Sequence, residues 1–103
     1  MVLERTPPTQ AACIFHAETF KETDGSVTIA LDEIDLVENG SNEQDAVGKL
    51  AEAILEYAKD FHADFAYWAR GSRRLHIPYV FESLSLDDVN AIRRLIVCRR
   101  GEI

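Results

Sequence analysis

The chain has 103 residues, of which 47% are hydrophobic, and eighteen acidic residues against eleven Lys and Arg give a formal charge of -7. This apolar content excludes a disordered chain, and the length suits a single domain over residues 1–103 with a modest core. No apolar run approaches the roughly 18 residues that a membrane-spanning helix requires, so we expect no transmembrane segment.

The first ten residues include Pro7 and Pro8 and are predicted to form a loose arm. They lack the basic start and apolar middle of a signal peptide, so we expect a cytoplasmic protein. Cys13 and Cys98 are too far apart in sequence to suggest a disulfide framework or a zinc site. We therefore expect both thiols to be reduced and buried as small hydrophobic groups.

A β-hairpin and a third short strand open the predicted fold. Residues 11–21 and 27–31 alternate between apolar and polar side chains, which is typical of half-buried strands. Asp24-Gly25 between them favours a hairpin with a primed turn, because glycine adopts the positive φ that such a turn needs. Ile34, Leu36 and Val37 indicate the third strand, which is predicted to end at Asn39-Gly40.

A long amphipathic helix is predicted from about Asn42 to about Phe61. Ser41 and Gln44 form a Ser-x-x-Gln capping box, which satisfies free backbone donors at a helix start. Gly48 costs this helix about 1 kcal/mol relative to alanine. Apolar side chains recur at spacings of three and four residues: Val47, Leu50, Ala51, Ile54, Leu55, Ala58 and Phe61.

The remaining sequence predicts a strand, a loop, an extended segment and a short helix. Residues 65–69 are rich in aromatic side chains and favour a fourth strand, followed by a loop over residues 70–74. Residues 77–81 are predicted to be extended at an edge, because Pro78 cannot donate a ladder hydrogen bond. Ser85 is predicted to cap the second helix, which is followed by a basic tail.

Together these elements predict an α+β fold. A small antiparallel sheet, made of the β-hairpin plus further strands, is expected to carry the long amphipathic helix on one face, with a short C-terminal helix. This order is that of the small units in HicB-like antitoxins and double-stranded-RNA-binding-like folds. The analogy concerns topology and does not determine function.

Charge is distributed unevenly along the chain. Residues 1–69 hold fourteen acidic and four basic residues, a formal charge of -10, whereas residues 70–103 hold seven basic and four acidic residues, a charge of +3. All seven of these bases are arginines, whose planar guanidinium suits carboxylate and phosphate recognition. The candidate partner- or nucleic-acid-binding residues are therefore Arg70, Arg73, Arg74, His76, Tyr79, Arg93, Arg94, Arg99 and Arg100. The alternative is that the arginines are surface residues that pair with the chain's own acids.

The sequence contains no strong enzyme or metal motif. There is no His-x-x-x-His pair, glycine-rich phosphate loop or dinucleotide fingerprint, so we expect no catalytic residue, metal or cofactor. His76 with Arg73 and Tyr79 is a weak ribonuclease pattern, and a hydrogen-bonded loop histidine is the more ordinary interpretation. A run of carboxylates is more consistent with a solvated strand face than with a cation site: Asp32, Glu33, Asp35 and Glu38.

Several segments resemble a known family. Residues 31–40, the helix with Leu55-Glu56-Tyr57-Ala58, the segment Ser72 to Val80 and the closing Asp87-Asp88-Val89 helix are similar to the Phd-like antitoxins of RelE/RelB-type toxin–antitoxin systems. The resemblance implies a non-catalytic protein that neutralises a small toxin, often a ribonuclease, and that can repress its own operon. The sequence differs from Phd/YefM and RelB antitoxins in lacking their recognisable DNA-binding units.

We therefore predict an antitoxin-like homodimer that binds a small basic RelE-type toxin. The acidic part of the chain is expected to complement the basic surface of the toxin, and exposed strand edges offer a second mode of binding. The alternative is a nucleic-acid-binding regulator that acts on DNA through the arginine-rich C-terminal third. A small ribonuclease is the least favoured hypothesis.

Overall fold

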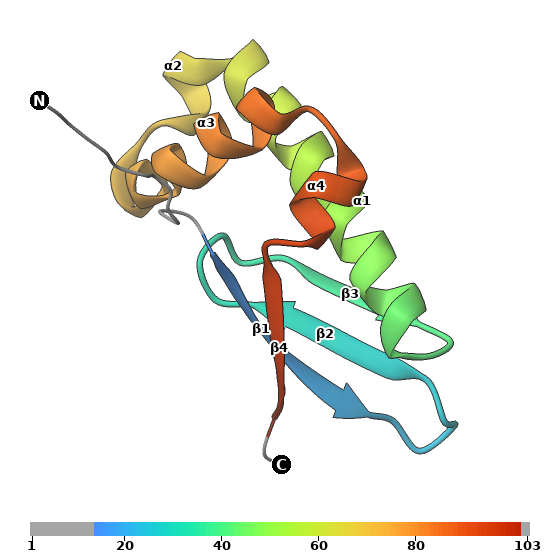
Figure 1. Cartoon of the computed structure of the whole chain (residues 1–103). Helices are drawn as coiled ribbons and strands as arrows, with labels where there is room; N and C mark the ends of the chain where they lie inside the picture. The colour runs from blue at the N-terminus through green and yellow to red at the C-terminus, as the bar shows by residue number, and fades with distance from the viewer. Residues whose placement is uncertain (1–13, 102–103) are drawn as a thin grey trace, which may run out of the picture.

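The computed structural model describes residues 14–101, which form a four-stranded sheet with all helices on one of its faces (Figure 1). The strands follow the spatial order β3-β2-β1-β4. Their bounds are β1 (Phe15–Lys21), β2 (Val27–Leu31), β3 (Val37–Gly40) and β4 (Ile96–Arg100). The helical segments are α1 (Glu43–Ala63), α2 (Phe65–Trp68), the 3₁₀ helix η1 (Gly71–His76), α3 (Ile77–Leu86) and α4 (Val89–Arg93). None of these helices is long and apolar enough to cross a membrane.

The predicted α+β class and the long helix packed on the sheet are confirmed. The sheet is mixed rather than wholly antiparallel. The β1–β2 and β2–β3 pairs are antiparallel, but β4 runs parallel to β1 and pairs Phe15 with Ile96 and Ala17 with Cys98. A parallel neighbour requires a long crossover connection, and here the helical segments supply it.

The β1–β2 hairpin forms where it is predicted, but its loop is different. The loop holds three residues, Thr23-Asp24-Gly25, closed by hydrogen bonds from Gly25 N to Glu22 O (3.0 Å) and from Glu22 N to Ser26 O (2.8 Å). Within the described chain Gly25 has a φ of 92° but Asp24 has no positive φ. The predicted primed turn is therefore wrong, because a two-residue turn with Asp24 and Gly25 at its centre needs positive φ at both residues.

The third strand begins later than predicted. Asp35 has a φ of 57°, which breaks the extended conformation, and β3 then runs from Val37 through Gly40. Ile34 is buried, but it belongs to the bend that precedes β3 and not to a strand. The Asn39-Gly40 pair ends the strand by pairing with Thr28 and Val27 of β2, and Gly40 lies directly against the backbone of α1.

Helix α1 starts one residue beyond the predicted cap. Asn42 is the N-cap, and its side-chain oxygen accepts a hydrogen bond from Asp45 N (2.8 Å). Asp45 in turn accepts from the backbone N–H of Ser41 (2.9 Å), and this hydrogen bond lowers the pKa of the Asp45 carboxyl. The predicted Ser-x-x-Gln box is therefore wrong: Asn42 accepts from Asp45, and Asp45 accepts from Ser41.

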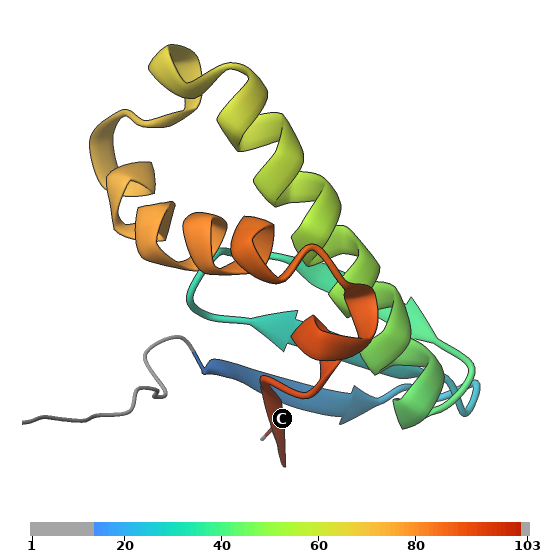
Figure 2. The same cartoon turned by 45° about the horizontal axis from the view of Figure 1, so that its top comes forward.

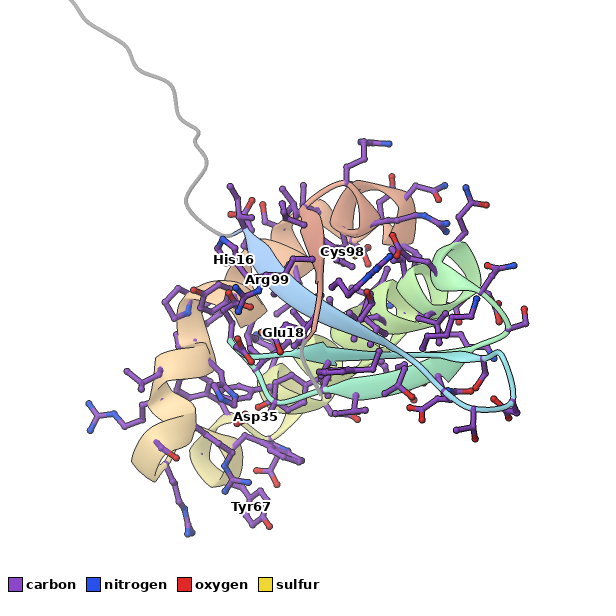
Figure 3. All side chains as sticks on the ribbon, turned by 90° about the horizontal axis from the view of Figure 1, so that it is seen from below. His16, Glu18, Asp35, Tyr67, Cys98 and Arg99 are labelled. Atoms are coloured by element: carbon purple, nitrogen blue, oxygen red, sulfur yellow. The ribbon has the colours of Figure 1, made fainter. Side chains whose placement is uncertain are left out.

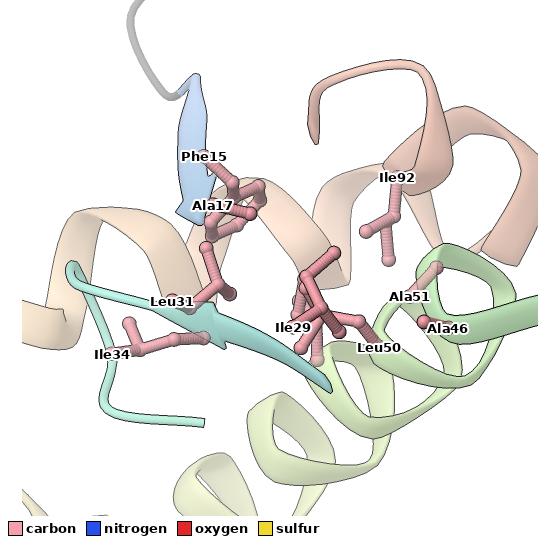
Figure 4. Packing of buried hydrophobic residues seen from close by; sticks show 10 residues of the cluster. Phe15, Ala17, Ile29, Leu31, Ile34, Ala46, Leu50, Ala51 and Ile92 are labelled. Carbon is pink, nitrogen blue, oxygen red and sulfur yellow. The ribbon is translucent and has the colours of Figure 1, made fainter. Parts of the chain in front are cut away.

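The apolar stripe of α1 is buried against two different partners. Its first half packs on the sheet, where the core contains Phe15, Ile29 and Leu50 (Figure 4). Its second half extends beyond the sheet and packs with α3 (Figure 2). The second core consists of Ala58, Phe61 and Val80, all nearly inaccessible to solvent. The helix therefore joins a sheet core to an all-helical core.

The predicted strand and extended segment between residues 65 and 81 are wrong, because this region is helical. Residues 65–68 form α2, residues 71–76 form η1 where a loop was predicted, and residues 77–86 form α3. Pro78 lies in the first turn of α3, where a backbone N–H has no partner within the helix, so its missing donor costs nothing.

The C-terminal elements also differ from the prediction. Ser85 lies inside α3, and Asp88 is the residue that caps the short helix α4, by accepting from Asn90 N at 3.0 Å. The basic tail forms β4. Cys98 is half-buried on this strand and its pKa is raised by burial, whereas Cys13 and the N-terminal arm fall outside the described residues.

Substituting Gly40 tests the closeness of β3 and α1. A Cβ at this position would lie 2.4 Å from Ala46 N, a backbone atom that cannot move aside without displacing the helix. We expect Gly40→Ala to lower the free energy of unfolding by about 3 kcal/mol or more in chemical denaturation.

Gly48→Ala is the matched control for Gly40→Ala. A Cβ at residue 48 would meet only the end of the Arg93 side chain, at 3.0 Å, which can swing away. The gain in helix propensity of about 1 kcal/mol offsets the loss of that contact. Equal destabilisation by the two substitutions would contradict the close backbone contact.

Candidate partner-binding site

The structure distributes the predicted site residues over three places. Arg70, Arg73 and Arg74 lie with His76 in and beside η1, Arg93 and Arg94 lie in and after α4, and Arg99 and Arg100 lie on β4 (Figure 1). The seven arginines therefore do not form a single basic face. The first group lies beside several exposed aromatic and aliphatic side chains, whereas Arg99 lies beside one, Val97.

We define the helical tip as residues 65–81, comprising α2, η1 and the first half of α3. Four of the seven exposed large apolar side chains of the described chain lie here. Leu75 is 75% exposed and Tyr67 51%, and Phe65 and Phe81 are also exposed. The other exposed large apolar side chains of the described chain belong to the sheet or its start: Ile14 precedes β1, and Val37 and Val97 lie on the sheet face that carries no helix. Clustered exposure of this kind marks interaction surfaces on soluble proteins, whereas single exposed residues do not.

Two guanidinium groups stack on the aromatic rings of α2. The Arg73 guanidinium lies 5.1 Å from the centre of the Trp68 ring and 5.5 Å from that of Tyr67, and the Arg70 guanidinium lies 5.6 Å from the Tyr67 ring. These are cation–π distances. The Tyr67 and Trp68 rings are themselves perpendicular, with centroids 5.4 Å apart. The stack orders side chains that are otherwise flexible.

Aromatic contacts anchor the tip to the end of α1. The Tyr57 ring packs edge-on against Phe61, Trp68 and His76, at centroid distances of 5.7, 5.9 and 5.8 Å. Phe61 also stacks on Trp68 at 6.4 Å. Such pairs add about 0.5–1.5 kcal/mol each beyond the burial of area, so the tip is held as a packed unit.

His76 is buried, with 7% of its surface exposed, and its Nδ1 lies 2.7 Å from the Tyr57 hydroxyl. Its Nε2 lies 3.7 Å from Asp35 Oδ2, on the loop between β2 and β3. Burial lowers the pKa of His76, the Asp35 carboxylate opposes this shift, and Arg73 adds to it. Burial also raises the pKa of Tyr57. A neutral His76 that accepts from the Tyr57 hydroxyl fits these conditions.

This environment argues against the ribonuclease hypothesis. A general base must reach its substrate, and His76 instead lies beneath the tip with one nitrogen occupied by Tyr57. Tyr79 is directed toward the sheet core, where its ring centre lies 5.5 Å from that of Phe15. His76 and Tyr79 therefore support the tip from inside.

Two of the four described arginines outside the tip make polar contacts within the chain. Arg93 donates to Gln44 O (3.1 Å), and its guanidinium lies beside Gly48 of α1. Arg99 pairs with Glu18 on the sheet face that carries no helix, seen from below in Figure 3. His16 is on the same face and pairs with Glu33 at 2.7 Å. For Arg93 and Arg99 the structure thus supports the alternative of ordinary internal pairing.

The run of carboxylates from Asp32 to Glu38 does not assemble a cation site. Glu33 binds His16, and Asp35 turns toward His76. Within residues 14–101 no three His, Cys, Asp or Glu side chains are grouped so that they could hold a metal ion.

The comparisons with known proteins agree with one another. Residues 11–98 match the PHD_like family, described as "Antitoxin of toxin-antitoxin, RelE / RelB, TA system". The chain belongs to this antitoxin family. The family resemblance inferred from sequence is therefore confirmed, and it supports the expectation of a non-catalytic protein. No curated protein matches the sequence.

A crystal structure from Syntrophomonas wolfei subsp. wolfei, described as the antitoxin part of a proposed toxin/antitoxin system, has a similar fold. It is 35% identical in sequence and superposes with a TM-score of 0.79 over 85% of the antitoxin-family chain. The match covers 64% of the Syntrophomonas chain. The antitoxin-family chain thus spans about two thirds of that protein.

Several site residues escaped prediction from the sequence. Tyr57 was not among the predicted stripe residues of the long helix, and Leu75 lay between the predicted loop and the predicted extended segment, because no helix was expected where the tip folds. The signal that was available is the spacing of Ile77, Val80 and Leu84, which matches a helix and would have placed Leu75 beside it.

The low pKa of His76 predicts how acid affects stability. A histidine whose pKa is lowered by folding binds protons more readily in the unfolded chain, so stability falls as the pH drops below the ordinary value of 6.5. We expect His76→Gln, which retains a polar partner for Tyr57, to lose less stability than the wild type between about pH 7.5 and about pH 5.5.

Denaturation with urea at the two pH values measures the difference. His62→Gln, at an exposed position on α1, is the matched control and should lose as much stability as the wild type. Equal acid sensitivity in the wild type and His76→Gln would show that burial of His76 does not contribute.

Proposed function

We propose that this chain is a toxin-neutralising antitoxin that binds a small basic RelE-type toxin through the helical tip. The observation that carries the proposal is the clustering of exposed apolar side chains with arginines on residues 65–81. Trp, Tyr and Arg are the residues that dominate the binding energy of protein interfaces. Membership of the antitoxin family identifies a toxin as the class of partner that this surface suits.

Charge supports a basic partner. Residues 1–69 carry a formal charge of -10. The exposed face of α1 contributes Glu52, Glu56 and Asp60, and Lys59 on the same helix lies 3.7 Å from Asp87. Ribonuclease toxins need basic surfaces to bind RNA, so an acidic antitoxin surface speeds association and favours the correct partner.

Operon autoregulation requires DNA binding, for which the tip arginines are the candidates. Arg93 and Arg99 are engaged within the chain, and the remaining described arginines are divided between the tip, the end of α4 and β4, which disfavours one continuous phosphate-binding surface. We therefore rank protein binding above direct DNA recognition by this chain.

Co-purification tests the proposal. The tagged chain is expressed with the gene adjacent to its own, and we expect a stoichiometric small basic protein to remain bound on a sizing column at moderate salt. The free chain on the same column is expected to run as a homodimer. The proposal would be contradicted if the chain is recovered without a partner and if its expression does not restore the growth of cells that express the neighbouring gene.

A substitution at the tip locates the interface. Leu75→Asp places a charge where the side chain is 75% exposed, so the fold is unaffected while an apolar contact is lost. We expect affinity for the toxin to fall by about 2 kcal/mol, roughly thirtyfold in Kd by calorimetry. Val97→Asp, at a position 52% exposed on β4, is the matched control. If Val97→Asp weakens binding and Leu75→Asp does not, the interface is on the sheet.

A further inference from the structure

We infer that the helical tip recognises a protein segment that places a carboxylate beside an aliphatic side chain. The inference rests on the proposed function for the identity of the partner protein, but the chemistry of recognition comes from the tip itself. Three features of the tip support it: uncompensated arginines, an ordered stack, and an apolar hollow beside them.

Among residues 14–101, the tip arginines have no acidic partner. Within residues 14–101, Arg70, Arg73 and Arg74 form no ion pair with a carboxylate, although the chain has a net charge of -7. Arg99, in contrast, pairs with Glu18. A positive group left unpaired in an acidic protein is suited to an anionic group on a partner.

The stack on Tyr67 and Trp68 prepares these arginines for binding. Two of the guanidinium groups rest on ring faces at 5.1–5.6 Å, which limits the side-chain rotations that binding would otherwise freeze. Ordering before binding lowers the entropic cost of association. The planar edge of a stacked guanidinium remains available for two parallel hydrogen bonds to a carboxylate.

A shallow hollow of about 550 Å³ lies beside the arginines and is lined by Gly71, Arg74, Leu75, Ile77 and Pro78. Gly71 has a φ of 55° and no atom within 4 Å of where its Cβ would be, so the backbone leaves this wall open. Most of the lining is apolar, so an aliphatic side chain suits the hollow, while Arg74 at its side can bind a neighbouring carboxylate.

The same features disfavour nucleic acid as the occupant. Bases bind single-stranded sites by stacking on free aromatic faces, but Tyr67 and Trp68 already stack with the chain's own arginines. Asp60 and Asp64, at the end of α1 where α2 begins, would repel a polyanion more than a single carboxylate. A protein segment satisfies both the charge and the hollow.

Trp68 is the single tryptophan of the chain and lies in the tip, so its fluorescence reports directly on binding there. The full chain is titrated with a short capped peptide of Leu, Glu and Asp, with the matching Leu, Gln and Asn peptide, and with oligodeoxythymidine. We expect the acidic peptide to produce a saturable change and the amide peptide to bind roughly tenfold more weakly.

Two double variants with the same change in net charge separate the tip from general electrostatics. Arg70→Ala with Arg74→Ala should weaken binding of the acidic peptide roughly tenfold. Arg94→Ala with Arg100→Ala, at exposed positions outside the tip, should leave it within about twofold because such distant charges are screened. Trp68 fluorescence of each variant without peptide, equal to that of the wild type, is the control that the tip is folded.

The outcomes are distinct. Equal binding of the acidic and amide peptides, equal effects of the two double variants, or tighter binding of oligodeoxythymidine would overturn the inference. If the toxin is captured but its affinity is unchanged by Arg70→Ala with Arg74→Ala, the inference fails and the proposed function stands. If the acidic peptide binds at the tip but no toxin is captured, the proposed function fails and the recognition chemistry stands.

Discussion

The length of α1 relative to the sheet determines the rest of the structure. Its 21 residues extend about 32 Å, whereas the strands it packs against, β2 and β3, hold five and four residues and extend about 17 and about 13 Å. The apolar stripe continues to Phe61, so the half of the helix beyond the sheet requires a cover of its own (Figure 2). Helices α2, η1 and α3 provide that cover, and the chain then returns through α4 to add β4 beside β1.

This constraint explains which parts of the fold could be predicted from the sequence. Residues 27–31 and α1 follow local periodicity, and their burial agrees with the predicted faces. Residues 65–69 have the aromatic composition of a strand, yet they form a helix because they cover a helix. Strand β4 was missed because its pairing with β1 joins residues about 80 apart, and no local pattern records such a contact.

The candidate site was predictable only in part, for the same reason. The segment containing Arg70, Arg73 and Arg74 was identified by composition, and these residues do lie together. Their exposed neighbours Tyr67 and Leu75 were not identified from the sequence. Those side chains reach the surface because the tip folds around Tyr57 and the buried His76. A surface that combines ordered arginines with apolar groups is suited to a protein partner, which agrees with membership of an antitoxin family.

Hydrogen exchange of the chain with and without its toxin tests the central claim most directly, because it reports on every segment at once. The account predicts that binding slows exchange of the amides in residues 65–81, with little change in β1 and β4. Slower exchange confined to the sheet, with residues 65–81 unaffected, would contradict the assignment of the helical tip as the partner-binding surface.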